Sequence, residues 1–196
     1  MPALATTPIA VPPLVVHAQR RALAAGFHMS CTDRTGALLR TLVAMKPGGR
    51  VLELGTGVGV GTAWLLDGMD STAELVTVEA DPQVAAVAAD VVGSDHRVTT
   101  RTLDAAEFLA NYCGAPFDLA FVDCRPGKFH DRDQLLSRLA PGGIWIVDDL
   151  LPQHTWPDDH QSRVDQLLAE IGNEPTLLLS VLDWDTGLIV GTKRAE

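Results

Sequence analysis

The stretch RVLELGTGVGVGTAWLL, residues 50–66, decides the expected fold. A short apolar run leads into four alternating glycines, and an apolar segment with helical spacing follows them. A glycine-rich turn between a strand and a helix is a typical place to hold a nucleotide, because no side chain keeps the ligand away from the backbone. The identity of that nucleotide depends on the spacing of the glycines at positions 55, 57, 59 and 61.

The bulk composition predicts one globular domain. The chain has 196 residues, of which 46% are hydrophobic and 20% are charged. No apolar run is long enough for a transmembrane helix, and the first 21 residues lack a basic start and are interrupted by prolines, so we expect neither a membrane span nor a signal peptide. We predict a flexible tail over residues 1–12 and a single domain over 13–196, in which helices within 13–45 cover the site.

Net charge and cysteine content indicate the class of partner and the cellular compartment. The formal net charge is −10 and no Lys/Arg-rich run offsets it, which disfavours nucleic acid as a partner. Three irregularly spaced cysteines, Cys31, Cys113 and Cys124, argue against a disulfide framework and for a cytoplasmic protein.

Strand and helix patterns alternate along the chain, which predicts an α/β fold with a mostly parallel sheet, helices on both faces and an antiparallel C-terminal hairpin. The expected strands cover residues 50–54, 74–80, 97–103, 117–123, 144–149, 176–184 and 187–194. The expected helices cover residues 14–27, 30–45, 58–66, 83–92, 104–112, 132–140 and 158–172, with a closing turn at 141–143 after the sixth of them.

Ligands of open α/β sheets bind beyond the carboxyl ends of the strands, so the residues there are the candidate site. These ends lie at residues 53–59, 79–81, 104, 123–130 and 148–151, and several of them carry acidic side chains. A dinucleotide fingerprint would need a third glycine where this chain has Val60 or Thr62, which disfavours a nicotinamide dehydrogenase. Glu53, two residues before the first glycine, suits a ligand with a cationic group.

The segment VLELGTGVGVG resembles motif I of the class I S-adenosylmethionine-dependent methyltransferases. The resemblance implies a Rossmann-like seven-stranded fold with S-adenosylmethionine as cofactor. It implies that Glu53 contacts the methionine ammonium, that Glu79 binds the ribose hydroxyls and that Asp104 and Ala105 hold the adenine. Segment 28–42 resembles the part of the family that cradles the methionine end. The further cofactor contacts implied are Met29, Ser30, Gly55, Thr56, Gly57, Gly59, Ala80 and Asp123.

Each of these positions also has a plain structural reading. Glu79 alone is compatible with a surface acid, and Asp104 with a helix N-cap. The conjunction is more specific, because motif I, Glu79 and Asp104 fall at three successive strand ends in chain order.

The second half resembles the catechol and caffeoyl-coenzyme A O-methyltransferases through FDLAFVDCRPGKF and APGGIWIVDDLL. The resemblance implies O-methylation of a phenolic or enolic hydroxyl on a small molecule, and a homodimer is one expectation. It also implies a divalent metal on Asp123, Asp148 and Asp149, for which hard oxygen ligands suit Mg²⁺. The metal would favour the oxyanion of the acceptor.

Two positions depart from the subfamily pattern. Asp149 stands where asparagine is usual, and Pro126 stands where the lysine base is expected, with Lys128 two residues further on. Three carboxylates without a cation repel one another, so either a metal is present or the acids point apart. Asp149 could then be a loop or helix cap, and Asp123 could position substrate or cofactor without a metal.

Residues 148–160 follow the fifth strand and should overhang the acceptor site. Candidates for the base are Lys128 and His154, and Trp156 could stack on a planar acceptor. His160 is expected to be a surface residue or a structural cap over the site, and Cys124 to be a small buried residue.

Three alternatives to O-methylation remain open from the residues. The first keeps the fold and methylates N or C without a metal, with Asp123 and a histidine handling the proton. The second is a binding module for protein contacts, which the intact cofactor positions disfavour. The third is the nicotinamide dehydrogenase, which would bind NADH and not S-adenosylhomocysteine.

Overall fold

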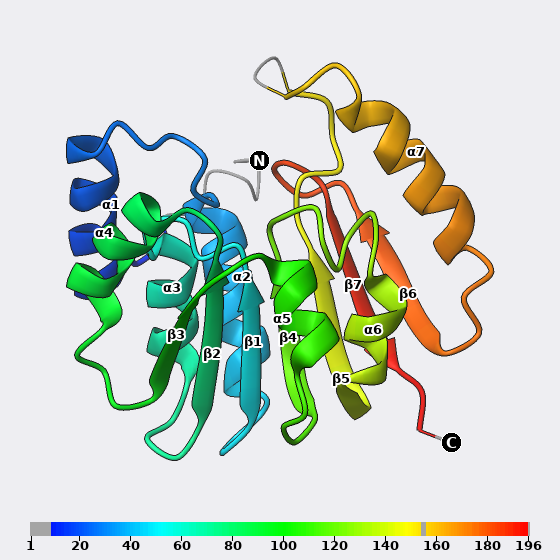
Figure 1. Ribbon diagram of the computed structural model, residues 1–196, viewed down its shortest axis with the longest axis horizontal. Helices are drawn as coiled ribbons and strands as arrows, with labels where there is room; N and C mark the ends of the chain where they lie inside the picture. Colours follow the sequence, from blue (N-terminus) through cyan, green and yellow to red (C-terminus); the bar gives the residue numbers. More distant parts are fainter. Residues whose placement is uncertain (1–8, 154–155, 196) are drawn as a thin grey trace, which may run out of the picture.

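The computed structural model describes residues 9–153 and 156–195 as a seven-stranded sheet with helices on both faces (Figure 1). The strand order is β3-β2-β1-β4-β5-β7-β6, and β7 runs antiparallel to both β5 and β6. The predicted fold class is therefore confirmed. The strands are β1 (Arg50–Leu54), β2 (Glu74–Glu79), β3 (Val98–Thr102), β4 (Phe117–Val122), β5 (Leu139–Val147), β6 (Leu177–Leu182) and β7 (Leu188–Lys193).

Seven helices are described. They are α1 (Pro13–Ala24), α2 (Asp33–Ala44), α3 (Val60–Gly68), α4 (Pro82–Val92), α5 (Ala105–Asn111), α6 (Arg132–Ser137) and α7 (His160–Ile171). Ile9 and Val11, within the predicted tail, pack against the core, and residues 1–8 lie outside the described part. No helix in the described ranges is long and apolar enough to cross a membrane.

Alternating side chains of the strands supply two cores, one on each face of the sheet. Val51 and Phe121 face the cluster that contains residues of α1 to α4. Leu52 and Val122, one position along the same strands, face the cluster with α5, α6 and α7. Strands buried on both faces read as continuous apolar runs, and this explains why the sequence indicated a parallel sheet.

Two predicted boundaries are wrong around β5. The turn expected at residues 141–143 lies inside the strand, because β5 already pairs with β4 at Leu139 and the register shifts before Ile144. Gly142, with φ 74°, makes this irregularity without a steric penalty. The strand also ends at Val147, so the two acids that follow belong to a turn.

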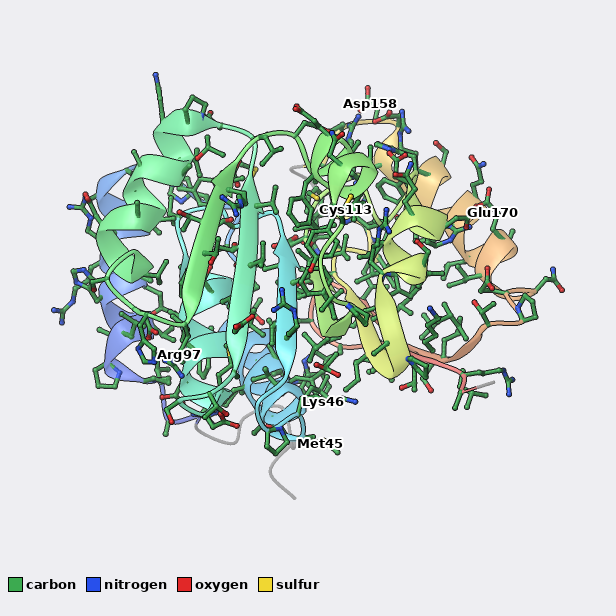
Figure 2. All side chains as sticks on the ribbon, turned by 60° about the horizontal axis from the view of Figure 1, so that its bottom comes forward. Met45, Lys46, Arg97, Cys113, Asp158 and Glu170 are labelled. Carbon is green, nitrogen blue, oxygen red and sulfur yellow. The ribbon has the colours of Figure 1, made fainter. Side chains whose placement is uncertain are left out.

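The parallel strands all point to one edge of the sheet, the upper edge in Figure 1, and the link between α1 and α2 also lies at this edge. Figure 2 shows Asp158, before α7, near this edge, while Met45 and Lys46 at the end of α2 lie at the opposite edge. The carboxyl-end edge is thus where the segments 27–32, 53–57, 123–129, 148–153 and 156–157 come together.

Candidate active site

Two adjoining cavities open at the carboxyl ends of the strands, with volumes of about 340 Å³ and about 590 Å³. The smaller one, here called the cofactor cavity, lies over β1 and β2. The larger one, the acceptor cavity, lies over the ends of β4 and β5. Their common wall includes Ser30, Cys31, Asp123, Asp149 and Trp156. A ligand in one cavity would therefore meet a ligand in the other at this wall.

The glycine turn after β1 is shaped by neighbouring backbone. A Cβ on Gly55 (φ 94°) would lie 2.6 Å from the backbone oxygen of Asp123, so only glycine allows the ends of β1 and β4 to approach this closely. The Gly57 N–H donates to Oε2 of Glu79 at 2.9 Å, which ties the turn to the end of β2. Gly59 lies outside the lining of the cofactor cavity, and its predicted cofactor contact stays a prediction. With φ 90°, it starts α3.

Glu53 is a buried carboxylate with one satisfied oxygen. Its Oε2 accepts from the hydroxyl of Thr62 at 2.5 Å and from that of Thr77 at 2.6 Å. Its Oε1 is buried, and no partner for it occurs among the described residues. Burial raises the pKa of Glu53 to about 7, although the two hydroxyls act to lower it. Glu53 lines the cofactor cavity, where a cationic donor would satisfy Oε1.

Two further acids border the cofactor cavity at successive strand ends. Glu79 ends β2, and its Oε1 accepts from the Asp81 N–H at 3.0 Å. Asp104 is the N-cap of α5 and accepts from the N–H of Ala106 at 2.8 Å. Both carboxylates are thus held in fixed orientations by backbone donors, and Asp104 combines the capping role with a place in the cavity wall.

The structure brings together nearly all of the predicted cofactor contacts. Met29 lies at the rim with 71% of its surface exposed. The predicted residues that line the cofactor cavity are Met29, Ser30, Glu53, Gly55, Thr56, Gly57, Glu79, Ala80, Asp104, Ala105 and Asp123.

Three carboxylates gather where the acceptor cavity meets the cofactor cavity. One oxygen each of Asp123, Asp148 and Asp149 lies within 4.8 Å of the others. Burial and then repulsion from Asp149 raise the pKa of Asp148 to about 6. The same two causes raise the pKa of Asp123 well above its ordinary value. The acids do not point apart, and their oxygen donors have the hardness that Mg²⁺, Mn²⁺ or Ca²⁺ prefers.

Three side chains from distant parts of the chain hold the turn that carries two of these acids. Asp149 has a left-handed backbone with φ 69°. Thr186, in the β6–β7 turn, donates to Oδ1 of Asp148 at 2.5 Å. Lys128 donates to the backbone oxygen of Asp148 at 3.0 Å, and Nε2 of His160 donates to that of Asp149 at 2.8 Å. Hydrogen bonds on both carbonyls keep the two carboxylates on one side of a strained turn.

The segment after β4 explains how Lys128 reaches this turn. The N–H of Gly127 (φ 80°) donates to the carbonyl of His130 at 2.7 Å, which closes a tight loop over residues 127–130. The lysine side chain is buried behind this loop, with 2% exposure, and its Nζ lies 5.2 Å from the ring centre of Phe129. Pro126 and Gly127, which precede Lys128, therefore belong to the loop that directs its side chain inward.

Three aromatic side chains, here called the aromatic wall, line the acceptor cavity. The rings of Trp156 and His160 stack with centres 4.5 Å apart, and Phe129 meets His160 edge-on at 5.4 Å. His160 is not a surface residue, because it is only 6% exposed. Its contacts with Trp156 and with the acidic turn agree with the other expected role, a structural cap over the site. His154 lies outside the described residues.

Sequence reasoning missed several residues of the site. Phe27 and Cys31 line the cofactor cavity, and burial raises the pKa of the Cys31 thiol, which therefore stays protonated. Thr62, Thr77 and Thr186 orient acids from other elements. These threonines lie 9, 24 and 38 residues from the acids they contact, and no local pattern marks such pairs, so only the fold reveals them.

Comparison with known proteins agrees with this geometry. A family model described as a methyltransferase domain matches residues 52–150, about half of the chain, which includes the glycine turn and the acid cluster. A catechol O-methyltransferase from Niastella koreensis is 32% identical over 127 residues, which are 62% of this chain and 58% of that protein. The chain spans about three fifths of the length of the curated relatives it matches.

Solved structures extend the likeness to the whole fold. One from Klebsiella pneumoniae, described as a candidate O-methyltransferase, has a TM-score of 0.82 at 28% identity and covers 95% of this chain and 92% of that one. An O-methyltransferase from Bacillus cereus in complex with SAH has a TM-score of 0.83 at 24% identity, with 95% and 93% coverage. The sequence match over the site and the shared fold together mean that this chain belongs to the family of methyltransferase domains.

Proposed function

We propose that this protein is an S-adenosylmethionine-dependent O-methyltransferase that acts on the hydroxyl group of a small molecule with the help of a divalent cation. The observation that carries the proposal is that each of two adjoining cavities has acidic oxygens that would accept a cationic partner. In the cofactor cavity this oxygen is Oε1 of Glu53. Beside the acceptor cavity these oxygens belong to the cluster of Asp123, Asp148 and Asp149.

The acidic residues that line the cofactor cavity fit the cationic and hydroxyl groups of S-adenosylmethionine. Glu53 would accept from the methionine ammonium, which would satisfy its free oxygen and lower its raised pKa. Glu79 would accept from the ribose hydroxyls, and Asp104 with Ala105 would hold the adenine. When bound, S-adenosylmethionine would supply a methyl group, and its sulfur would keep the electron pair of the broken C–S bond.

The acid cluster fits a divalent cation. Two donors, the Thr186 hydroxyl and the Asp149 N–H, already occupy Oδ1 of Asp148 and leave its Oδ2 to turn toward a cation. A cation there would polarise the acceptor hydroxyl by Lewis acidity. Asp123, which borders both cavities, would keep that hydroxyl next to the methyl group.

The aromatic wall would orient the acceptor and exclude water. Trp156 borders both cavities and presents a flat face, which suits a planar phenol or enol. The catechol O-methyltransferase among the relatives supports a catechol as the first acceptor to try. His154 would take the proton of the acceptor hydroxyl. Lys128 also lines the acceptor cavity, but its Nζ already donates to the backbone oxygen of Asp148.

The test measures binding and transfer separately. Thermal melting with S-adenosylhomocysteine or NADH, each with Mg²⁺ or a chelator, reports the ligands, and a ligand at ~100 times its Kd stabilises by about 2.7 kcal/mol. Mass spectrometry of catechol incubated with S-adenosylmethionine and Mg²⁺ reports the transfer. We expect stabilisation by S-adenosylhomocysteine, none by NADH, and methylated catechol only without chelator. Methylation that persists in chelator would favour a metal-free transfer.

A further inference from the structure

The strongest unexplained group beside the proposed metal site is a buried cation. Lys128 is 2% exposed, and its Nζ lies 3.9 Å from Oδ2 of Asp149 and 3.0 Å from the backbone oxygen of Asp148. Burying an ammonium is costly unless it is paired, so this position needs the acids around it.

The charges of this cluster can be counted. Around a bound cation, three ionised carboxylates and one ammonium would carry a net charge of −2, which is the charge that one divalent cation neutralises. Lys128 is the cation whose field lowers the pKa of both Asp123 and Asp148. Arg125 also lines the acceptor cavity, but it is half exposed and its ion-pair partner is Asp159 at 3.5 Å.

Without Lys128 the three acids would carry a charge of −3. Such a site would bind a trivalent cation much more tightly than a divalent one, because the attraction grows with the product of the charges. With a divalent cation it would keep a residual negative charge, which opposes the formation of an oxyanion on the acceptor beside it. The pairing with Asp149 removes this excess at the acid nearest to the lysine.

We propose that Lys128 is the fixed counter-charge of a three-carboxylate cation site, and that it matches this site to divalent over trivalent cations. The inference rests on the proposed function, since it assumes that the acid cluster binds a metal. Lys128 acts through the cluster as a positioning residue. Its hydrogen bond to the Asp148 carbonyl fixes the position of the acidic turn, and its charge next to Asp149 sets the net charge of the cluster.

The experiment compares the affinities of the full-length protein for Mn²⁺ and La³⁺. Free Mn²⁺ is followed by electron paramagnetic resonance, and La³⁺ is measured by its displacement of Mn²⁺. Lys128→Gln removes the charge and keeps a donor for the Asp148 carbonyl, whereas Lys128→Arg keeps the charge. Asp149→Asn removes one negative charge and keeps an oxygen ligand. The double variant Lys128→Gln/Asp149→Asn restores the net charge of −2.

We expect Lys128→Gln to raise the preference for La³⁺ over Mn²⁺ by about tenfold or more. Asp149→Asn should lower that preference by a similar factor, and the double variant should return to within about threefold of the wild type. Lys128→Arg should resemble the wild type. If Lys128→Gln fails to fold, the fall in Asp149→Asn still tests the charge argument.

Other outcomes separate the inference from the function on which it rests. An unchanged La³⁺/Mn²⁺ preference in folded Lys128→Gln, or equal effects of Lys128→Gln and Lys128→Arg, would overturn the counter-charge role and leave the methyltransferase intact. A wild-type protein that is stabilised by S-adenosylhomocysteine but binds no Mn²⁺ would overturn both the metal part of the proposed function and this inference.

Discussion

The hydroxyl of Thr186 donates a 2.5 Å hydrogen bond to Oδ1 of Asp148, 38 residues away in the chain. Thr186 lies in the turn between the last two strands, and Asp148 follows β5, to which β7 is paired. The C-terminal hairpin therefore orients a candidate metal ligand as well as completing the sheet. Such partners of metal ligands fix which oxygen faces the ion.

Replacing Thr186 by valine should weaken metal binding and spare cofactor binding. Valine keeps the shape but removes the donor, so Asp148 can rotate, and we expect Mn²⁺ affinity to fall by about tenfold. Titration calorimetry with Mn²⁺ and with S-adenosylhomocysteine measures both. Thr186→Ser, which keeps the hydroxyl, is the matched control and should bind Mn²⁺ like the wild type. Equal Mn²⁺ affinities of the valine and serine variants would contradict this role for the hydroxyl.

Glu53 should make the ligand-free protein less stable as pH rises. Its pKa is raised from 4.5 to about 7 in the folded state, so folding favours the protonated acid. This contribution is fully present below about pH 4.5 and is lost as pH rises through 7, and it amounts to on the order of 3 kcal/mol. Urea unfolding between pH 5 and 8 in chelator should show Glu53→Gln with a shallower loss of stability than the wild type.

The same variant should bind S-adenosylhomocysteine more weakly, because glutamine lacks the charge that the ligand's ammonium would meet at Oε1. Glu74→Gln, an exposed acid on the neighbouring strand β2, is the control and should change neither property. If the free energy of unfolding depends on pH in the same way in the wild type and in Glu53→Gln, burial does not raise the pKa of Glu53 as argued.

The order of elements could be predicted from the sequence because strands buried on both faces and amphipathic helices leave strong periodic signals. The acids at strand ends could be predicted for a related reason, since the carboxyl ends of parallel strands share one edge. The site's supporting contacts could not be predicted. Gly55 is needed for the closeness of the Asp123 carbonyl, and Thr62 and Thr77 meet Glu53 only after three elements have packed.

His160 shows why local patterns fail at such places. A histidine that follows prolines and acids at a helix start is typical of a surface, yet here it is buried against Trp156 and bonded to the carbonyl of Asp149. The predicted start of β5 was wrong for a different reason. Pro141 and two glycines predict a turn, but a bulge allowed the strand to continue through them.

Trp156 should contribute to acceptor binding through both its flat face and its N–H group. The Nε1 atom is buried, and no partner for it occurs in the described part of the chain. With catechol as the test acceptor, we expect Trp156→Phe to raise KM a few-fold and Trp156→Ala to raise it by about tenfold or more, since stacking is lost as well. Steady-state kinetics with each substrate varied in turn separates the change in KM for the acceptor from the change in KM for the cofactor.

Trp184→Phe is the matched control for that series. Its Nε1 is also buried without a partner in the described residues, but Trp184 stacks under Arg34 and lines neither cavity. Its KM for catechol should stay at the wild-type value. If Trp156→Phe and Trp184→Phe change KM equally, the effect comes from the fold and not from contact with the acceptor.

Gly36 should tolerate no side chain, because α2 packs directly on α3 at this residue. A Cβ there would lie 2.2 Å from Cδ1 of Trp64, whose ring is fully buried, so Gly36→Ala must displace that ring or separate the helices. We expect a loss of about 1–3 kcal/mol in the free energy of unfolding, measured with urea.

Gly172→Ala is the control, because its Cβ would meet its nearest neighbour at an ordinary 3.6 Å and its φ of −58° suits alanine. It should be as stable as the wild type or slightly more stable. Equal stabilities of the two variants would mean that the contact between α2 and α3 is looser than the structure has it.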